Sequence, residues 1–221
     1  WVNAVPGALG YVFHNYLEAW DAAPWGRYFF VSFFTASVQV AVGLFLAALA
    51  AFALARIPFP GKEAVFVLVL ATMMVPGEVL LIPNYVLLAR LGWLDTFYAL
   101  IVPWLASVFG IFLLRQFYLS LPQDLFDAAR IDGAGFFGIF RHVILPLSVP
   151  AFVVVAIWQF TQIWNEFLFA VTLTRPESQP ITVALAQLAG GEAVKWNLPM
   201  AGAILAALPT LLVYILLGRY F

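Results

Sequence analysis

Three glycines near the middle of the chain have the spacing of a nucleotide-binding turn. Gly133, Gly135 and Gly138 follow the order G-x-G-x-x-G, which lets backbone amides approach a dinucleotide pyrophosphate. That chemistry needs a buried strand before the glycines, a helix after them and an acidic residue about 20 positions further on. The preceding stretch DLFDAARID is polar and helical in pattern, and the first downstream acid is Glu166. The glycines therefore do not predict a dinucleotide site.

Two carboxylates inside long apolar stretches, Glu78 and Glu166, are the other candidates for chemistry. Helical spacings of three and seven residues put Gln159, Gln162 and Glu166 on one stripe, with Trp164 nearby as a stacking surface. Such groups either hydrogen-bond between helices or line a polar pathway, and both interpretations stay open. The candidate pathway residues are Glu78, Asn84, Gln159, Gln162, Trp164, Asn165 and Glu166.

The composition of the chain is that of a membrane protein. Apolar residues make up 65% and charged residues 10%, against about 45–50% and about 25% in soluble proteins. A net charge of −1 gives no basic surface for nucleic acid. There is no cysteine, and two histidines are too few for a histidine-based metal cluster, so we expect no metal site. The chain also lacks a G-x-x-x-x-G-K-[ST] loop, and we expect no directly bound cofactor.

Five apolar runs are long enough to cross a bilayer, which takes about 20 helical residues. They cover 28–55, 64–89, 96–114, 147–174 and 198–218. The second run contains Pro76 and Gly77, so we expect it to be bent, and polar residues interrupt the fourth run at 164–166. Lipid tolerates only helices or closed barrels, and no run alternates as a barrel strand does. The sequence predicts one all-α, polytopic membrane domain over residues 1–221, with five transmembrane helices.

Three segments connect these runs outside the membrane. We expect residues 1–27 to form an external connecting segment, 115–146 a cytoplasmic loop and 175–197 an external loop. Lys and Arg are in slight excess on the side assigned to the cytoplasm. This assignment places the start of the chain outside, so a further helix is expected before Trp1.

The 115–146 loop has the pattern of a helix, a glycine turn and a second amphipathic helix. Pro122 and Asp124 suit a helix start, and Gly133 suits a turn with positive φ. The second helix would offer an apolar face to a membrane surface or to a partner groove, through Phe136, Phe137, Phe140, Val143 and Ile144. The pattern alone leaves open whether this helix pair merely ties two spans together or has a function.

A spaced motif in this loop resembles that of a known family. Asp127-Ala128-Ala129, three residues, Gly133, nine residues and Val143-Ile144-Leu145-Pro146 resemble the E-A-A-x-x-x-G-x(9)-I-x-L-P loop of binding-protein-dependent ABC importer permeases. Further similarity to the carbohydrate-importer branch, in its maltose-permease-like class, lies in ALARIPFPGK, MMVPGEVLLIPNYVLLARLGWLDT, FLLRQFYLSLPQDLFDAARIDGA and WNEFLFAVTLT. Asp127 and Val143 replace the usual Glu and Ile but keep charge or shape.

The resemblance implies a transport role for the chain. Family members normally have six helices, and the 115–146 loop acts as a coupling helix seated on a separate ATPase subunit. The implied contacts are a charged or capping group at Asp127, close approach at Ala128 and Ala129, and a turn at Gly133. The full set of implied coupling residues is Asp127, Ala128, Ala129, Asp132, Gly133, Leu145 and Pro146. The chain would be a non-catalytic permease subunit of an ATP-driven, sugar-importing complex.

The implied partners are a cytoplasmic ATP-binding subunit dimer that carries ATP and Mg, a second permease subunit, an extracytoplasmic solute-binding protein and the lipid bilayer. The implied location is the inner membrane of a prokaryote. A secondary transporter with a broken helix and a buried carboxylate is the alternative, although the coupling-loop spacing argues against it. A membrane enzyme would need a nucleophile and base or a metal, and His14 and His142 fall on opposite sides of the membrane.

Overall fold

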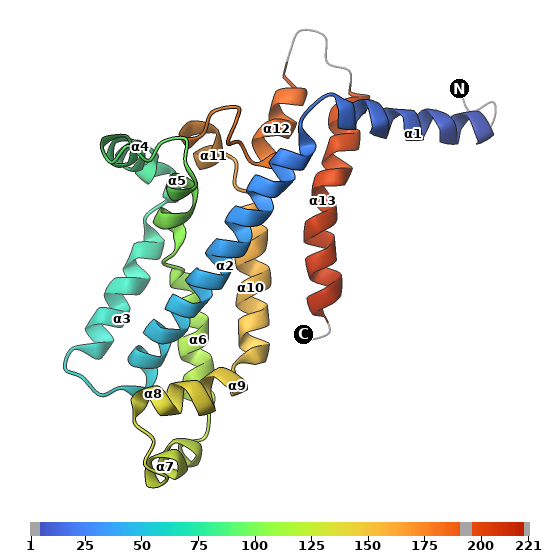
Figure 1. The fold of residues 1–221 in the computed structure, drawn as a ribbon. Helices are drawn as coiled ribbons and strands as arrows, with labels where there is room; N and C mark the ends of the chain where they lie inside the picture. The colour runs from blue at the N-terminus through green and yellow to red at the C-terminus, as the bar shows by residue number, and fades with distance from the viewer. Residues whose placement is uncertain (1–4, 191–195, 219–221) are drawn as a thin grey trace.

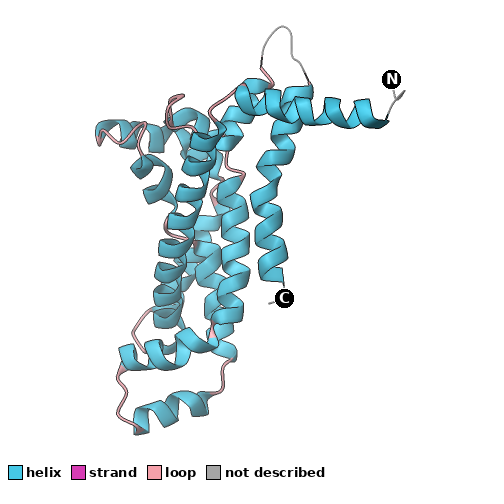
Figure 2. Cartoon of the chain, turned by 45° about the vertical axis from the view of Figure 1, so that its right-hand side comes forward, coloured by secondary structure: helices cyan, strands magenta, loops and turns pink. Residues whose placement is uncertain are grey.

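The computed structural model describes residues 5–190 and 196–218, and these residues form helices and turns without a strand (Figure 1; Figure 2). Residues 191–195 of the predicted external loop lie outside this description. The longer helices are α1 (Val5–Asp21), α2 (Trp25–Arg56), α3 (Lys62–Ala71), α4 (Leu81–Arg90), α6 (Val108–Ser120), α7 (Gln123–Ile131), α10 (Val149–Trp164), α12 (Ile181–Leu188) and α13 (Asn197–Leu217). The shorter ones are η1 (Thr72–Met74), η2 (Gly77–Leu80), α5 (Phe97–Ile101), η3 (Val102–Trp104), α8 (Phe136–Ile139), η4 (Phe140–Ile144), α9 (Leu145–Leu147) and α11 (Leu168–Leu173).

Three helical stretches are long and apolar enough to cross a membrane, namely Trp25–Arg56, Phe97–Ser120 and Asn197–Leu217. Two bent pairs of helices raise the number to five when each pair counts as one span. The predicted all-α membrane bundle is thus confirmed. The bend expected in the second run is also confirmed, because the axis turns by 88° between Lys62–Met74 and Gly77–Arg90. Pro76 and Gly77 stand at that bend, where proline cannot continue the helical hydrogen bonds.

The third apolar run is predicted to end at Leu114, before the charged Arg115, but the helix continues beyond that point. Helix α6 continues to Ser120, because Arg115 is accommodated inside the protein. Its guanidinium donates to both carboxylate oxygens of Glu63, at 2.8 and 3.0 Å, and to the carbonyl oxygen of Leu54 at 3.3 Å. A charge that is paired in this way does not have to mark the end of a buried helix.

Helix α2 packs along α6 through a stripe of small residues. Gly43, Ala47, Ala51 and Ala55 recur every four residues and are all buried. Positions i and i+4 share one helix face, so the stripe lets the two backbones approach closely. Nearer the end that carries α7, larger side chains fill the core between the helices. Leu114 and Tyr118 are among them and are fully buried.

The connecting segments gather at the two ends of the bundle. Helices α7, α8 and α9 lie at one end, whereas α1, α4, α11 and α12 lie at the other (Figure 1). Helix α1 forms most of the predicted external segment, lies against the start of α13 and then extends sideways beyond the bundle (Figure 1). The Asn197 amide at the start of α13 donates to the side-chain oxygen of Asn15 in α1, at 3.0 Å.

Asp95 joins two loops at the end that carries α1. Its carboxylate oxygen accepts hydrogen bonds from the Ser178 hydroxyl and from the Arg175 backbone N–H, the latter at 2.9 Å. The Asp95 N–H donates in turn to the carbonyl of Leu173, at 2.9 Å. The hydrogen bond from Ser178, followed by that from Arg175, lowers the pKa of the Asp95 carboxyl below its ordinary value.

These contacts predict a pH dependence of the loop between α11 and α12. A carboxyl whose pKa is lowered in the folded state contributes stability at neutral pH, and that contribution is lost as the pH falls through the folded pKa. We expect protection of the Arg175 amide from hydrogen exchange, corrected for intrinsic rates, to fall below about pH 4. In Asp95→Ala, which has no side-chain acceptor, the protection should already be low at pH 6 and should not change on acidification. Asp124→Ala at the opposite end is the control and should behave as the wild type.

Candidate functional site

The segment between α6 and α10 is built around the turn at Gly133. Helix α7 ends at Ile131, and Gly133 has φ = 83°, which confirms the predicted positive φ. The Ala134 N–H donates to the Ala129 carbonyl at 2.9 Å, and the Gly133 N–H donates to the Arg130 carbonyl at 3.0 Å. This pair of bonds is a Schellman motif, which stops a helix and reverses the chain. The chain then runs back as one helical stretch through α8, η4 and α9 (Figure 2).

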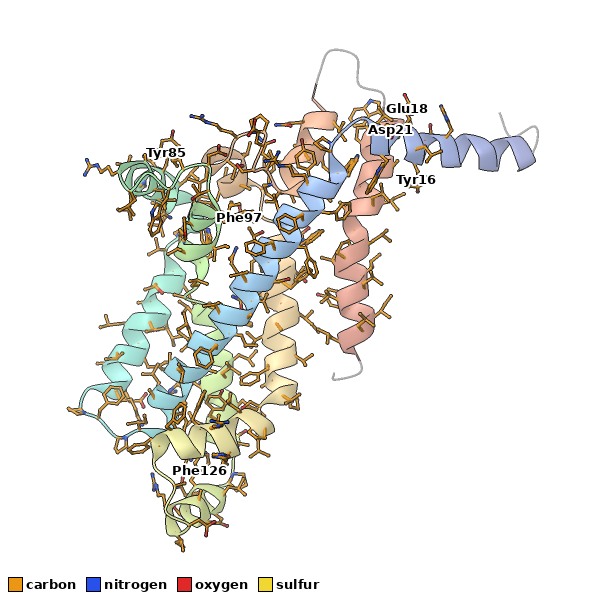
Figure 3. The ribbon with its side chains drawn as sticks, in the orientation of Figure 1. Tyr16, Glu18, Asp21, Tyr85, Phe97 and Phe126 are labelled. Carbon is orange, nitrogen blue, oxygen red and sulfur yellow. The ribbon has the colours of Figure 1, made fainter. Side chains whose placement is uncertain are left out.

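Arg56, the last residue of α2, ties this segment to the bundle. Its Nε and Nη2 donate to the Tyr118 carbonyl, Nη2 also donates to the Leu121 carbonyl at 2.7 Å, and Nη1 donates to Gln123 Oε1 at 2.7 Å. The guanidinium carbon lies 4.1 Å from the ring centroid of Phe126, which is buried (Figure 3). Arg56 therefore fixes both the end of α6 and the start of α7. Sequence reasoning missed this role, because a charged residue beside an apolar run indicates only the end of a span.

Arg56 and Arg115 form a reciprocal pair of contacts, which we call the arginine clasp. Arg56 on α2 binds carbonyls at the end of α6, while Arg115 on α6 binds the Leu54 carbonyl near the end of α2. The Arg115 guanidinium also lies 3.9 Å from the ring centroid of Phe66 on α3. Helix C-termini carry partial negative charge, so each cation stabilises the end of the neighbouring helix. The clasp makes α2, α3, α6 and α7 one unit at this end.

The predicted coupling residues divide between an outer and an inner face. Asp127, Ala128, Asp132, Gly133 and Pro146 are exposed, whereas Ala129 and Leu145 are partly buried against the core. The Asp127 carboxylate accepts from the Gln123 amide at 3.1 Å and lies 3.5 Å from Arg130.

One part of the expected apolar face of the second helix is corrected by the structure. Phe140 and Ile144 are 2% and 0% exposed and pack in the core beside Phe52, so they are not available to a partner. Phe136 and Phe137 remain exposed, as expected. Val143 is partly buried against the same core, so Phe136 and Phe137 are the exposed members of the predicted apolar face.

A cavity of about 450 Å³ lies in the other half of the bundle, between α2, the α5–α6 region and α10–α11. Its size falls within the range of about 300–1,000 Å³ typical of ligand pockets. Gln159, Gln162 and Glu166 all line it, so the structure brings the predicted stripe together. Other polar lining residues are Ser32, Thr35, Gln39 and Ser107, and aromatic ones are Trp104, Phe109, Trp158 and Phe169.

Helices are interrupted on two sides of this cavity. Residues 105–107 separate η3 from α6, and residues 165–167 separate α10 from α11. Side chains satisfy the backbone groups that the breaks release: Ser107 Oγ accepts from the Gly110 N–H at 3.2 Å, and Glu166 Oε1 accepts from the Phe169 N–H at 2.9 Å. Non-helical backbone at membrane depth is tolerated only inside protein or beside a water-filled cavity. Both breaks lie beside this cavity, which is a setting in which a membrane protein tolerates them.

Two buried glutamines in the cavity wall keep spare hydrogen-bonding capacity. The side-chain amide of Gln39 donates to the backbone carbonyl of Leu100 at 3.0 Å. The side-chain amide of Gln159 donates to the backbone carbonyl of Gln39 at 3.4 Å. The Oε1 atoms of both side chains are buried without a hydrogen-bond partner among the described residues. An unsatisfied buried acceptor costs about 1–3 kcal/mol. Gly43 leaves room for this arrangement, because a Cβ there would lie 2.6 Å from Gln159 Nε2.

The stacking role predicted for Trp164 is wrong for this cavity. Trp164 is 3% exposed, packs on Phe160 and donates from its indole to the Ala206 carbonyl of α13 at 2.9 Å. Successive helical residues turn by about 100°, so Trp164 points away from the face of Gln159 and Glu166. Trp158 lines the cavity instead.

The other predicted pathway residues are not among those that line the cavity. Glu78 is exposed in η2, just after the bend, and Asn84 is partly buried in α4. Asn165 is exposed and donates to the Thr161 carbonyl at 2.8 Å. Within residues 5–190 and 196–218, no group of three or more His, Cys, Asp or Glu side chains is placed to hold a metal ion.

Comparison with known proteins gives a consistent family. Residues 39–221 match the family described as "Binding-protein-dependent transport system inner membrane component". The arabinooligosaccharides transport system permease protein AraQ of Bacillus subtilis is 33% identical over 196 residues, covering 88% of this chain and 70% of that protein. The sn-glycerol-3-phosphate transport system permease protein UgpE of Yersinia enterocolitica is 33% identical, covering 100% of this chain and 81% of that protein.

A solved structure shares the fold. A chain from the crystal structure of a bacterial ABC transporter involved in the import of the acidic polysaccharide alginate superposes with a TM-score of 0.78, at 24% identity. The match covers 89% of this chain and 75% of that chain.

The arginine clasp predicts that Arg56→Lys loosens α7. Lysine keeps the charge but cannot reproduce the planar fork that bridges Tyr118, Leu121 and Gln123. Loss of hydrogen bonds to a charged group costs about 1.5–3 kcal/mol each, so amide exchange over residues 122–132 should accelerate about tenfold or more. The control is Arg130→Lys, whose contact with Asp127 is exposed and should change exchange little. Equal exchange in both variants would contradict the clasp.

Proposed function

Since the chain belongs to the family of binding-protein-dependent transport system inner membrane components, we propose that it couples ATP hydrolysis in a separate subunit to alternating access of the membrane pathway. The chain is a multi-pass membrane permease of a binding-protein-dependent importer. The coupling element is the predicted loop 115–146, in the part that follows the end of α6 at Ser120. The solute pathway passes the cavity lined by Gln159, Gln162 and Glu166.

The shape of the coupling segment is the observation that carries this proposal. Helix α7 projects beyond the ends of the long helices (Figure 1), and its inner side is held by Phe126 and the arginine clasp. Its outer side carries Ile131, which is 86% exposed, and the nearby Phe137 is 70% exposed. Exposed apolar side chains on a rigidly attached helix suit a partner surface. A partner that moved α7 would therefore move the bundle with it.

The partners follow from the same proposal. A cytoplasmic ATP-binding subunit dimer would receive α7 and would carry the ATP and Mg, which leaves this chain without a catalytic role. A second permease subunit would complete the membrane pathway, and an extracytoplasmic solute-binding protein would deliver the solute at the end that carries α1 and α12. The proposed location is the inner membrane of a prokaryote.

The proposed solute is a sugar, an oligosaccharide or a sugar-like compound. The relatives are named for arabino-oligosaccharides and for sn-glycerol 3-phosphate, and the solved structure for alginate. These names span neutral and anionic solutes. They support a carbohydrate as the solute class, for neutral and anionic solutes alike.

Affinity purification from the native membrane tests the assembly. We expect this chain to recover two stoichiometric partners, a second multi-span permease and an ATPase with a G-x-x-x-x-G-K-[ST] loop. Recovery of the chain alone, stable and transporting without ATP, would overturn the proposal in favour of a secondary transporter.

The coupling turn gives a prediction for Gly133→Pro. Proline requires φ near −65° and has no N–H, whereas Gly133 has φ = 83° and donates to Arg130. We expect the purified complex to keep hydrolysing ATP while uptake per ATP hydrolysed falls at least about tenfold, since an altered turn disconnects α7 from the bundle. The measurement is uptake into proteoliposomes alongside phosphate release.

Gly135→Ala is the matched control for that variant. Gly135 has φ = −72°, and a Cβ there would meet no atom within 4 Å. Its uptake per ATP should equal that of the wild type. Fully coupled transport in Gly133→Pro would show that this turn does not transmit the motion.

A further inference from the structure

We propose that the cavity within this chain is itself a solute-binding subsite and that it selects an uncharged, polyhydroxylated solute over a phosphorylated or carboxylated one. The inference rests on the proposed function, because it concerns the solute of the same pathway. It is carried by the charge, the hydrogen-bonding groups and the aromatic surfaces of the cavity wall.

The charge of the wall excludes anions. Among the 18 residues that line the cavity, Glu166 is the only ionisable one, and neither Lys, Arg nor His is present. A phosphate or carboxylate that leaves water needs a cation or several donors to replace its hydration. Here it would meet a carboxylate instead. A neutral solute has no such cost.

The hydrogen-bonding groups of the wall complement hydroxyl donors. Gln39 and Gln159 each hold a buried Oε1 acceptor that has no partner in the part of the chain that the structure describes. Glu166 uses Oε1 to accept the Phe169 N–H, and its second carboxylate oxygen adds another acceptor. Meanwhile the Thr35 hydroxyl already donates to the Val31 carbonyl. A sugar hydroxyl can donate to the Glu166 carboxylate directly, and to the two glutamine oxygens once their side chains turn toward the cavity, since both glutamines are almost fully buried. An ionised phosphate oxygen only accepts.

Aromatic rings supply the apolar part of the subsite. Phe109 and Trp158 pack with ring centroids 4.3 Å apart, and Trp104 and Phe169 with centroids 4.5 Å apart. Both pairs line the cavity. Trp104, Phe109 and Trp158 keep exposed surface that can take the C–H face of a sugar ring, whereas Phe169 is buried behind Trp104. The exposed Gln162 amide and the Glu166 carboxylate can meet the hydroxyls of the sugar. The solute class that satisfies all three features is a neutral sugar or oligosaccharide.

Because the chain contains no cysteine, a single introduced cysteine can be labelled selectively within it. Gln162→Cys places one thiol in the exposed part of the cavity lining. In the purified complex, its rate of modification by a cationic methanethiosulfonate, the ethylammonium reagent, is compared with that by the anionic ethylsulfonate reagent. Gln187→Cys, exposed on α12 and outside the lining, corrects for the intrinsic reactivity of the reagents. The labelled chain is separated from its partners before the label is measured.

We expect the cation-to-anion rate ratio in Gln162→Cys to exceed that in Gln187→Cys by about fivefold, the size expected for reagents of opposite charge near one carboxylate in water. Combining Glu166→Gln with Gln162→Cys should lower the cation-to-anion ratio to that of Gln187→Cys. The amide oxygen of the new glutamine can still accept the Phe169 N–H, so the local fold is kept. An equal or higher rate for the anionic reagent in the cavity variant would overturn the charge selection. Failure of the cavity variant to react while the α12 variant is labelled would overturn the subsite. Neither result would affect recovery of the ATPase and the second permease, so the importer assignment is tested separately.

Discussion

The close packing of α2 against α6 is the constraint on which the rest of the structure depends. Four small buried residues on α2, one every four positions, remove the side chains that would hold the two backbones apart. At one end of the stripe, Gly43 admits the Gln159 amide into the cavity wall. At the other end, Ala55 precedes Arg56 of the arginine clasp. One helix interface thus reaches from the candidate solute cavity to the coupling segment.

This interface explains how two distant features can act together. At 1.5 Å per residue, Gln39 and Arg56 lie about 25 Å apart along α2. No loop intervenes, since α2 is unbroken from Trp25 to Arg56. Packed helices shift as rigid bodies rather than deform continuously. A displacement of α7 that pulls on Arg56 would therefore reach the hydrogen bonds of Gln39, and the reverse is equally true.

Sequence reasoning found what local spacing determines and missed what depends on tertiary contacts. The proline and glycine at 76–77 indicate a bend, and a glycine after a helical run indicates a Schellman turn, because backbone sterics act locally. The part played by Arg115 could not be predicted this way, since its partner Glu63 stands 52 positions away. Gln39 could have been found, because an amide inside the apolar run 28–55 needs a partner.

The structural and the transporting interpretations of the polar stripe need not compete. Glu166 accepts from the backbone after the break at 165–167, Ser107 does the same after the break at 105–107, and both residues line the cavity. A bilayer would reject those breaks without polar side chains to receive the freed backbone groups. The same residues must therefore exist for the cavity to form at all. A binding surface differs from a purely structural one in the hydrogen-bonding capacity that remains unused. Here that capacity is the Glu166 carboxylate and two glutamine oxygens without a partner among residues 5–190 and 196–218.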